Sequence, residues 1–419
     1  MNSGSAELAE KVLVILKTFL HGNNSFEISN LISNKLLQIL QDTMIASDSQ
    51  AEKTLPSILT ILCLLQQKSQ PKIVLDGTYF KLFYNVNNIS GKSSLRSENI
   101  LQPALNFLYC SIHLTSTTCK VRATAVILSN TSLLELIEEI MEKTWDTAQN
   151  EFSESLCCSA WLMTSALMIF QQCYNLQVHR TVQVDVNNLV EFISFKFKDT
   201  SFLLIVSILQ HLKALLKQKF SSPFIKLEHR NHPRPEPPDA VWPLTTQSTR
   251  YLVAALQNLL VQKDTLLLQT TIDCFGSLLD FLHDKAPDLA RHVASLPWNR
   301  SVLLVSLSCK ANDYLQPGVL RLISLFVKYE SLNVLTLDEI NQLIDEAAHL
   351  KMIDLSQTAL LDLQIFLLQI QNKHIELEPA RKAVIEDLLK NIDSIPMDFM
   401  STSILYVNGT AICLTDTAE

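Results

Sequence analysis

Two short groups of side chains in this sequence have the chemistry to bind a transition metal. Thiolate, imidazole and carboxylate groups are the ligands that zinc takes in proteins. The first group is Cys110, His113 and Cys119, and the second is Glu228, His229 and His232. Neither group has the paired Cys-x-x-Cys or His-Glu-x-x-His spacing of a zinc site. We therefore predict no metal site: the two cysteines pack in helix cores, and the histidines of the second group are solvated.

The common sequence signatures of enzymes are missing from the chain. It has no Gly-x-Ser-x-Gly nucleophile elbow, no glycine-rich phosphate loop and no Gly-x-Gly-x-x-Gly dinucleotide fingerprint. The adjacent thiols of Cys157 and Cys158 lie beside Trp161 in an apolar run, which favours packing over reactivity. A triad assembled from distant residues stays open as an alternative. The sequence predicts a protein that is not an enzyme and needs no cofactor.

Basic side chains gather in the segment 191–234, where eight lysines and arginines face three acidic residues in a chain of net charge −8. They are Lys196, Lys198, Lys213, Lys217, Lys219, Lys226, Arg230 and Arg234. One interpretation is a basic ridge that contacts an acidic partner or a nucleic-acid backbone. The alternative, a solvated helix face followed by a charged linker, is favoured because few aromatic residues are interleaved and the pI is about 5.7. From residue 331 onward the balance reverses, with fourteen acidic and five basic residues.

Few glycines are available to build anything other than helices. The chain has seven in 419 residues, and sheets, tight hairpins and phosphate loops all draw on glycine's freedom at positive φ. Apolar residues recur with helical spacing, beginning with Leu8, Val12, Ile15 and Phe19. Further helices are predicted over 54–68, 98–114, 119–129, 132–145, 152–174, 186–196, 201–219, 246–261, 265–283, 298–310, 317–330, 337–350, 356–371 and 379–391. These segments predict an all-α fold.

A weak internal repeat links three of these segments. Each has a proline at the expected first turn of a helix, at Pro56, Pro103 and Pro317, followed by apolar residues at positions +2, +5, +6 and +9. The first two prolines are 47 residues apart, and the other interval fits about five units of about 43 residues. Repeats of this length are typical of HEAT and armadillo arrays. Any amphipathic helix that starts with proline gives the same register, so chance is the alternative.

The helical succession and its repeat resemble the armadillo/HEAT-like superfamily over residues 1–395. Within that superfamily the chain is also similar to a vertebrate family whose armadillo-like fold serves the formation of programmed DNA breaks in meiosis. The resemblance implies an α-solenoid of stacked helical hairpins. It carries no individual functional residue over to this sequence.

Prolines break the helical pattern near the middle of the chain. The segment 221–244 contains six of them, which bars a helix and favours extended backbone. We predict two helical-repeat regions, 1–220 and 245–395, joined by this linker or loop.

The tail, 396–419, has a different pattern. Two β-prone runs flank Asn408-Gly409, which is a strong signal for a β-hairpin. An isolated hairpin is marginally stable, so we expect it to dock on the last helices, to pair with a strand of a partner, or to be only partly ordered.

These observations favour a non-enzymatic scaffold that binds other proteins through a concave surface. The alternative is a nuclear factor that acts at chromosomes in meiotic recombination, in break formation or synapsis, with the basic ridge contacting DNA or an acidic partner. Nine cysteines in mostly apolar segments, with no signal peptide and no apolar run of membrane length, predict an intracellular protein, cytoplasmic or nuclear, without membrane contact.

Overall fold

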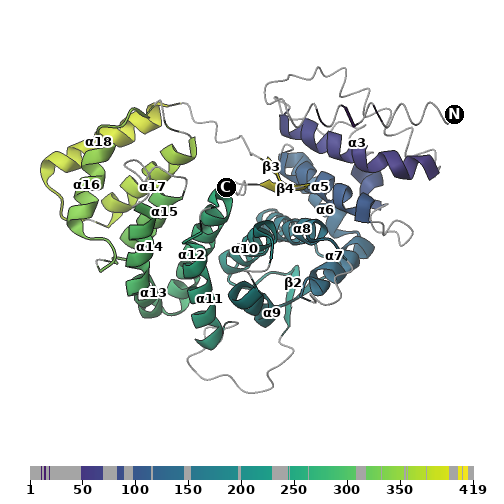
Figure 1. Ribbon diagram of the computed structural model, residues 1–419, viewed down its shortest axis with the longest axis horizontal. Helices are drawn as coiled ribbons and strands as arrows, with labels where there is room; N and C mark the ends of the chain where they lie inside the picture. Colours follow the sequence, from purple (N-terminus) through teal and green to yellow (C-terminus); the bar gives the residue numbers. More distant parts are fainter. Residues whose placement is uncertain are drawn as a thin grey trace. The chain divides into compact units, whose positions relative to one another are not determined.

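The computed structural model describes the greater part of the chain. The described residues are 11, 14–15, 18, 49–68, 83–88, 98–114, 117–145, 152–196, 200–228, 244, 246–262, 264–307, 318–331, 333–352, 355, 357–373, 375–395, 404–407 and 409–413. Most of them are helical (Figure 1), so the predicted all-α class is confirmed. They fall into two compact units: the first comprises Met1–Asp185, Ser221–Glu228 and Met400–Glu419, and the second comprises Val186–Phe220 and His229–Phe399.

Five helices form the body of the first unit among its described residues. They are α3 (Ser49–Lys68), α5 (Glu98–Leu114), α6 (Thr117–Leu128), α7 (Thr131–Lys143) and α8 (Glu154–Cys173). Helix α5 packs between α3 and α8, while α6 and α7 pack against α8. Because α8 has neighbours on several sides, 15 of its 20 residues are buried. Its first turn is closed by Ser153, whose hydroxyl accepts a hydrogen bond from the backbone N–H of Leu156.

A small parallel sheet in the first unit was not anticipated from the sequence. Strand β1 (Val182–Asp185) pairs with β2 (Ile225–Glu228), with Val182 opposite Ile225. The alternation of valine with polar residues in Val-Gln-Val-Asp is a short strand signal, but it leads directly into the helical run 186–196, so the local pattern does not separate it from the helix. The predicted 221–244 linker therefore contains a strand at 225–228, and residues 229–243 lie outside the described residues. The predicted division of the chain there stays a prediction.

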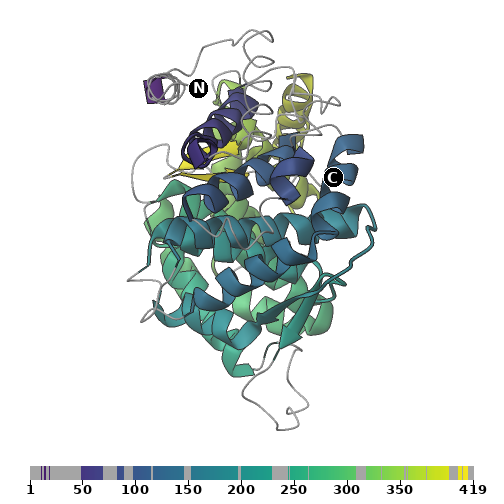
Figure 2. The ribbon, with the colours of Figure 1, turned by 90° about the vertical axis from the view of Figure 1, so that its right-hand side faces the viewer.

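The predicted C-terminal hairpin forms, but it docks elsewhere than on the last helices. Strands β3 (Ile404–Val407) and β4 (Thr410–Cys413) pair antiparallel, and they pack on α3, α5 and α8 of the first unit, as Figure 2 shows for the yellow strands beside the purple α3. The carbonyl of Gly409 accepts hydrogen bonds from Gln102 Nε2 (3.1 Å) and Asn106 Nδ2 (2.6 Å). The expectation of docking on the last helices is wrong because the matching polar groups lie on α5, about 300 residues earlier.

The second unit is built from two rows of helices. In one row α10 (Phe202–Lys217), α12 (Thr265–Lys285), α15 (Val319–Lys328) and α17 (Gln357–Asn372) pack one on the next. The other row contains α9 (Val186–Glu191) with the π-helical turn η2 (Phe192–Lys196), α11 (Thr246–Leu259), α14 (Pro297–Leu307), α16 (Leu337–Ala347) and α18 (Pro379–Ser394). Helix α13 (Pro287–Ala294) packs on α12. Figure 1 shows α12, α15 and α17 in succession and α16 beside α18.

Two of the predicted helix starts are confirmed in the second unit. Thr336 caps α16 in a capping box, in which its hydroxyl accepts from the N–H of Glu339 and the carboxylate of Glu339 accepts from the N–H of Thr336. Pro379 occupies the first turn of α18.

The predicted position of the repeat prolines is wrong for two of the three. Pro56 and Pro103 lie inside α3 and α5, because those helices begin one or two turns before them. Each proline therefore removes an internal backbone hydrogen bond instead of sitting where none is needed. Pro317 lies outside the described residues.

Two helices of the described residues have the length and composition of a membrane span. They are α8 and α12. In the structure 83% of the apolar window of α8 and 72% of that of α12 are buried within the protein. The sequence-based expectation that no apolar stretch has membrane length is therefore wrong for these two helices, and the absence of membrane contact stays a prediction.

Two of the scarce glycines allow close packing in the second unit. Gly318 has a φ of 92° immediately before α15, and a Cβ added there would lie 3.0 Å from Cδ1 of Ile272. Gly276 lies inside α12, where an added Cβ would lie 3.1 Å from Cδ2 of Leu325 on α15. Helices α12 and α15 approach closely at this point because the residue has no side chain.

We expect Gly318→Ala to lower the free energy of unfolding by about 1–3 kcal/mol, since an L-residue is strained at this φ and its Cβ crowds Ile272. Urea-induced unfolding measures the effect. Gly276→Ala is the matched control: a gain of up to about 1 kcal/mol in helix propensity offsets the contact with the flexible Leu325 side chain. Equal stability of the two variants would contradict the assignment of strain to Gly318.

Candidate functional site

The predicted basic ridge is spread over both units. Lys213 lies on α10, with Lys217 at its end and Lys219 two residues beyond, while Lys196 ends η2. These four belong to the second unit, whereas Lys226 lies on β2 of the first unit and is exposed. Lys198, Arg230 and Arg234 lie outside the described residues. Contact of these eight residues with a partner or nucleic acid stays a prediction.

Two of the lysines form ion pairs within the second unit. The ammonium of Lys213 lies 3.1 Å from Oδ2 of Asp273 on α12, and the side chain of Lys213 is 13% exposed. The ammonium of Lys219 lies 3.0 Å from Oδ2 of Asp284, and both side chains are about half exposed. Lys213 thus has a structural partner inside the protein, and Lys217 and Lys219 are more accessible to a ligand.

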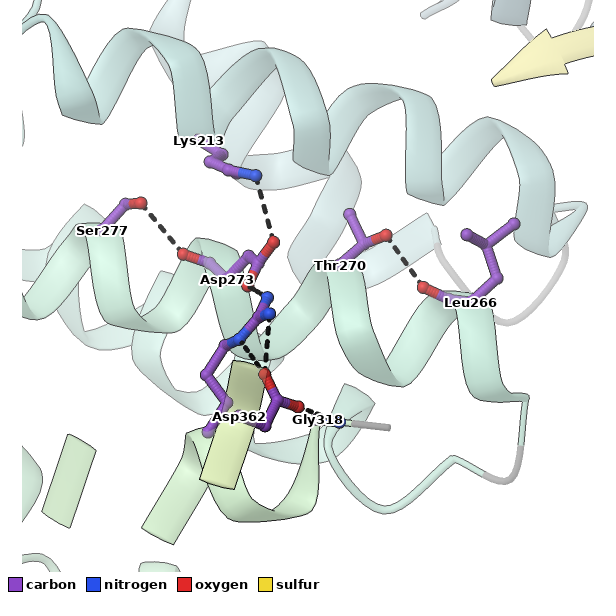
Figure 3. Close-up of polar contacts among 8 residues, drawn as sticks. Lys213, Leu266, Thr270, Asp273, Ser277, Gly318 and Asp362 are labelled. Atoms are coloured by element: carbon purple, nitrogen blue, oxygen red, sulfur yellow. Dashed lines mark hydrogen bonds and ion pairs between the residues drawn. The ribbon is translucent and has the colours of Figure 1, made fainter. Parts of the chain in front are cut away.

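The pair formed by Lys213 is one end of a partly buried ion network that sequence reasoning missed (Figure 3). Asp273 accepts from Lys213 through Oδ2 and from Arg321 Nη1 through Oδ1, at 2.6 Å. Arg321, on α15, also donates from Nε to Oδ1 of Asp362 at 2.9 Å. The other oxygen of Asp362 accepts from the backbone N–H of Gly318 at 3.0 Å. The network therefore connects α10, α12, α15 and α17 in sequence.

The two carboxylates of this network respond differently to their surroundings. Burial alone would raise the pKa of Asp273, but attraction to Lys213 and Arg321 outweighs it, and the pKa is lowered. The pKa of Asp362 is raised, because its burial and the charge of Asp273 outweigh the help of Arg321 and Gly318. Arg321 is held firmly protonated between the two, with its pKa raised. Asp273 is thus the anchor of the network and stays ionised at neutral pH.

This arrangement can fix the register of the four helices relative to one another. Each oxygen of Asp273 and of Asp362 accepts a hydrogen bond from a neighbouring helix or from the backbone before α15, so both carboxylates are held in place. The sequence did contain a signal: Asp273, Arg321 and Asp362 interrupt apolar helical stretches. Charged residues at such positions are almost never fully buried unless paired, and pairing across helices could have been anticipated.

Similar polar pairs join the helices of the other row. Asn299 of α14 accepts from Gln257 of α11 at 2.7 Å. Arg300 of α14 forms a two-pronged pair with Glu339 of α16, at 2.6 and 2.8 Å. The hydrogen bonds with Arg300 lower the pKa of Glu339 to about 2.

A further pair joins α16 and α18 in this row. Arg381 of α18 holds Asp345 of α16 through two bonds of 2.9 and 3.0 Å. Each neighbouring pair of helices from α11 to α18 in this row is thus tied by at least one side-chain bridge.

The metal-binding residues weighed above are not gathered into a site among the described residues, where no group of three or more histidine, cysteine, aspartate or glutamate side chains could hold an ion. His113 is buried and its ring packs against Tyr109 and Phe170, with ring centroids 4.5 and 5.1 Å away. Cys157 is also buried, and burial raises the pKa of its thiol to about 11, so it is protonated at neutral pH. His229 and His232 lie outside the described residues.

His211 on α10 is fully buried, and desolvation lowers its pKa to about 3. The unfolded chain binds a proton at this residue below its ordinary pKa of about 6.5, while the folded chain does not until about pH 3. Stability therefore falls as the pH is lowered through this window. We expect His211 to lower the free energy of unfolding by about 2 kcal/mol when the pH falls from 7 to 5.

The His211→Gln variant tests this expectation. Urea unfolding at the two pH values should show the loss of stability reduced by about 2 kcal/mol relative to the unmodified chain. An unchanged pH dependence would show that His211 is not the group responsible.

The chain is similar in sequence to two known vertebrate proteins. It is 40% identical over 373 residues, 88% of its length, to meiosis inhibitor protein 1 of Mus musculus. It is 37% identical over 423 aligned residues, 98% of its length, to meiosis inhibitor protein 1 of Homo sapiens. The matches cover 29% and 33% of those relatives, so the chain spans about a third of their length. No protein-family model matches it. The resemblance to a vertebrate meiotic family drawn from the sequence is confirmed.

Proposed function

We propose that the chain is a helical-repeat scaffold of meiosis, starting from its similarity to meiosis inhibitor protein 1 over most of its length. In this proposal it is an α-solenoid of the armadillo/HEAT type, has no enzymatic activity, and binds other proteins in the nucleus. The observation that carries the solenoid is the spacing of the polar bridges in the second unit.

Most of these bridges join residues at separations close to the predicted repeat, whereas Lys213 and Asp273 are 60 residues apart. The separations are 42 for Gln257 and Asn299, 48 for Asp273 and Arg321, 41 for Arg321 and Asp362, 39 for Arg300 and Glu339, 43 for Glu330 and Lys373, and 36 for Asp345 and Arg381. A solenoid repeat contacts only its neighbours, so its bridges should recur at about the repeat length. Repeats of HEAT and armadillo type are about 40–47 residues long.

The direction of the helices supports the same proposal. Asp273 and Asp280 of α12 pair with Arg321 and Lys328 of α15, each at a separation of 48 residues. Moving seven residues along one helix thus moves seven residues along the other, so α12 and α15 run parallel. Helices that repeat in parallel within one row, with the second row between them in sequence, are what stacked helical hairpins produce.

A scaffold that binds proteins is favoured over a factor that binds DNA through the basic ridge. Lys213 and Lys219 are paired with carboxylates of the protein itself, which reduces the charge they offer to a phosphate backbone. Lys217 and Lys226 are exposed. In the DNA-binding alternative, replacing both with alanine should lower the affinity for duplex DNA and its dependence on salt. Unchanged binding, or no binding at low salt, would count against that alternative.

Capture from meiotic germ cells tests the proposed function. The tagged full chain should retain specific proteins from nuclear extracts of cells that are undergoing recombination, and retain far fewer from extracts of non-dividing somatic cells. The Asp273→Asn variant, which we expect to disturb the packing of α10, α12 and α15, serves as the matched control and should retain less. Failure of the correctly folded chain to retain any protein would contradict the scaffold proposal.

A further inference from the structure

Two buried cysteines of the first unit meet across neighbouring helices. Cys63 lies on α3 and Cys110 on α5, and they are 1% and 0% exposed. The two helices pack against each other, and the thiol of Cys63 forms a hydrogen bond with Cys110. A disulfide requires side chains that point toward each other from backbones a short distance apart. Two thiols in contact across a packed pair of helices meet that requirement.

The helical repeat explains why these two thiols meet. Cys63 follows Pro56 by seven residues, and Cys110 follows Pro103 by seven. The cysteines are therefore 47 residues apart, which is also the interval between the two prolines. Residues one repeat apart lie side by side in a stacked array, as the polar bridges of the second unit do. The contact between the thiols is thus a consequence of how α3 stacks on α5.

The C-terminal hairpin covers this pair of thiols. Tyr406 of β3 forms hydrogen bonds with Thr60 of α3 and with Asn106 of α5, so its side chain bridges the two helices. Thr60 and Asn106 each lie one helical turn before a cysteine, on the same face of the helix. Burial raises the pKa of the Tyr406 hydroxyl, and the nearby Cys63 and Cys110 raise it further. The docked strand therefore lies directly against the cysteine pair.

Each thiol reacts slowly while it is buried in this way. Burial and the contact with Cys110 raise the pKa of the Cys63 thiol well above its usual value, so little of the nucleophilic thiolate is present at neutral pH. The pair differs from an isolated buried cysteine in its second sulfur. Once one thiol is oxidised, a resolving thiol is already in contact with it. Opening of the hairpin exposes both sulfurs to solvent and to small oxidants.

We propose that Cys63 and Cys110 form a redox-sensitive pair whose access is controlled by the C-terminal hairpin. When the hairpin opens, the sulfur of one cysteine loses its proton and attacks hydrogen peroxide, the O–O bond breaks, and a sulfenic acid and water form. The other thiol attacks this sulfur, the hydroxyl group leaves with the thiol proton as water, and an S–S bond joins α3 to α5. Two electrons pass from the sulfurs to the peroxide. The inference goes beyond the proposed function and does not depend on it.

Oxidation of the full chain with hydrogen peroxide tests the proposal. Peptide mass spectrometry, after alkylation of the remaining thiols, should find Cys63 linked to Cys110. The exposed Cys173 is the positive control for the oxidant, and the buried Cys274 of the second unit should stay reduced. The linked chain should unfold at a higher urea concentration than the reduced chain, because the disulfide closes a long loop of the unfolded state. Cys63→Ala should show neither the link nor the shift.

Variants of β3 test the control by the hairpin. Tyr406→Ala should speed formation of the linked peptide by about tenfold, because opening of the docked strand then costs less free energy. Leu405→Ala truncates an exposed side chain of the same strand and should leave the rate unchanged. Tyr406→Phe keeps the ring and should speed the reaction by a smaller factor. Thermal transitions check that each variant folds, and hydrogen exchange of the β4 amides measures how often the hairpin opens.

Three results would overturn the inference. The first is the absence of the Cys63–Cys110 peptide from both the unmodified chain and Tyr406→Ala when Cys173 is fully oxidised. The second is a link from either cysteine to a third one at a comparable rate. The third is an equal rate in Tyr406→Ala and Leu405→Ala, which would show that the hairpin does not control access to the pair.

Discussion

Replacing Asp273 with asparagine is expected to lower the free energy of unfolding of the second unit by about 3–5 kcal/mol. The carboxylate lies between Lys213 and Arg321, at 3.1 and 2.6 Å. Without its charge, two partly buried cations, with side chains 13% and 31% exposed, face each other, and the desolvation of each is no longer offset. The loss is large because Arg321 also bridges to Asp362, so that a single substitution loosens contacts among four helices.

The control for this variant lies two turns further along the same helix. Asp280 pairs with Lys328, again across 48 residues, but its side chain is 53% exposed. Asp280→Asn should cost no more than about 1 kcal/mol, and the asparagine can still accept the hydrogen bond that Tyr329 donates to Asp280. Urea unfolding followed by helix circular dichroism compares the two. Similar losses of stability in both variants would contradict the expectation that the less exposed carboxylate, Asp273, contributes more than Asp280.

The network also predicts the direction of an acid effect. Because the pKa of Asp273 is lowered in the folded protein, its contribution to stability is present above its unfolded pKa of about 3.9 and is lost as the pH falls through the folded value. The Asp273→Asn variant should lack this loss. The pKa of Asp362 is raised, so this residue contributes stability as the pH falls. Its contribution opposes the loss of stability caused by Asp273 and reduces the net change.

Helix positions in this protein follow directly from local patterns in the sequence. The predicted segment 98–114 coincides with α5, and 337–350 begins where α16 begins, because apolar spacing and capping residues act within a few residues of each other. Helix α13 was missed: it is short, and its start at Pro287 follows a longer helix after a single residue, Ala286.

Local sequence patterns do not show which residues far apart in the chain pair with each other. The Asn408-Gly409 turn identified a hairpin, but nothing near it indicates that Asn106 and Tyr109 provide its hydrogen-bond partners. The same holds for Asp273 and Arg321, whose meeting depends on how α12 stacks on α15. The repeat length did contain this information, since residues one repeat apart are neighbours in a stacked array.

Removing the C-terminal hairpin is expected to destabilise the first unit strongly. In a chain that ends at residue 399, we expect that unit to lose at least about 4 kcal/mol of stability while the second unit keeps its own. All four residues of β4 are buried, and burying an isoleucine such as Ile412 alone contributes about 1.5–3 kcal/mol. The loss also leaves Asn106 and Tyr109 without the backbone groups they now bind, at a cost of about 1–3 kcal/mol for each buried group.

Hydrogen exchange distinguishes this outcome from a general loss of folding. Amides of α5 and α8 should exchange much faster in the truncated chain, while those of α12 and α15 should keep their protection. Adding the peptide 400–419 in excess should restore protection of α5 and α8, since the peptide supplies the same strands in trans. Gly409→Ala is the milder variant: its φ of 84° disfavours an L-residue, and the added Cβ would lie 3.2 Å from Nε2 of Gln102. Unchanged protection of α5 in the truncated chain would show that the hairpin covers the first unit without stabilising it.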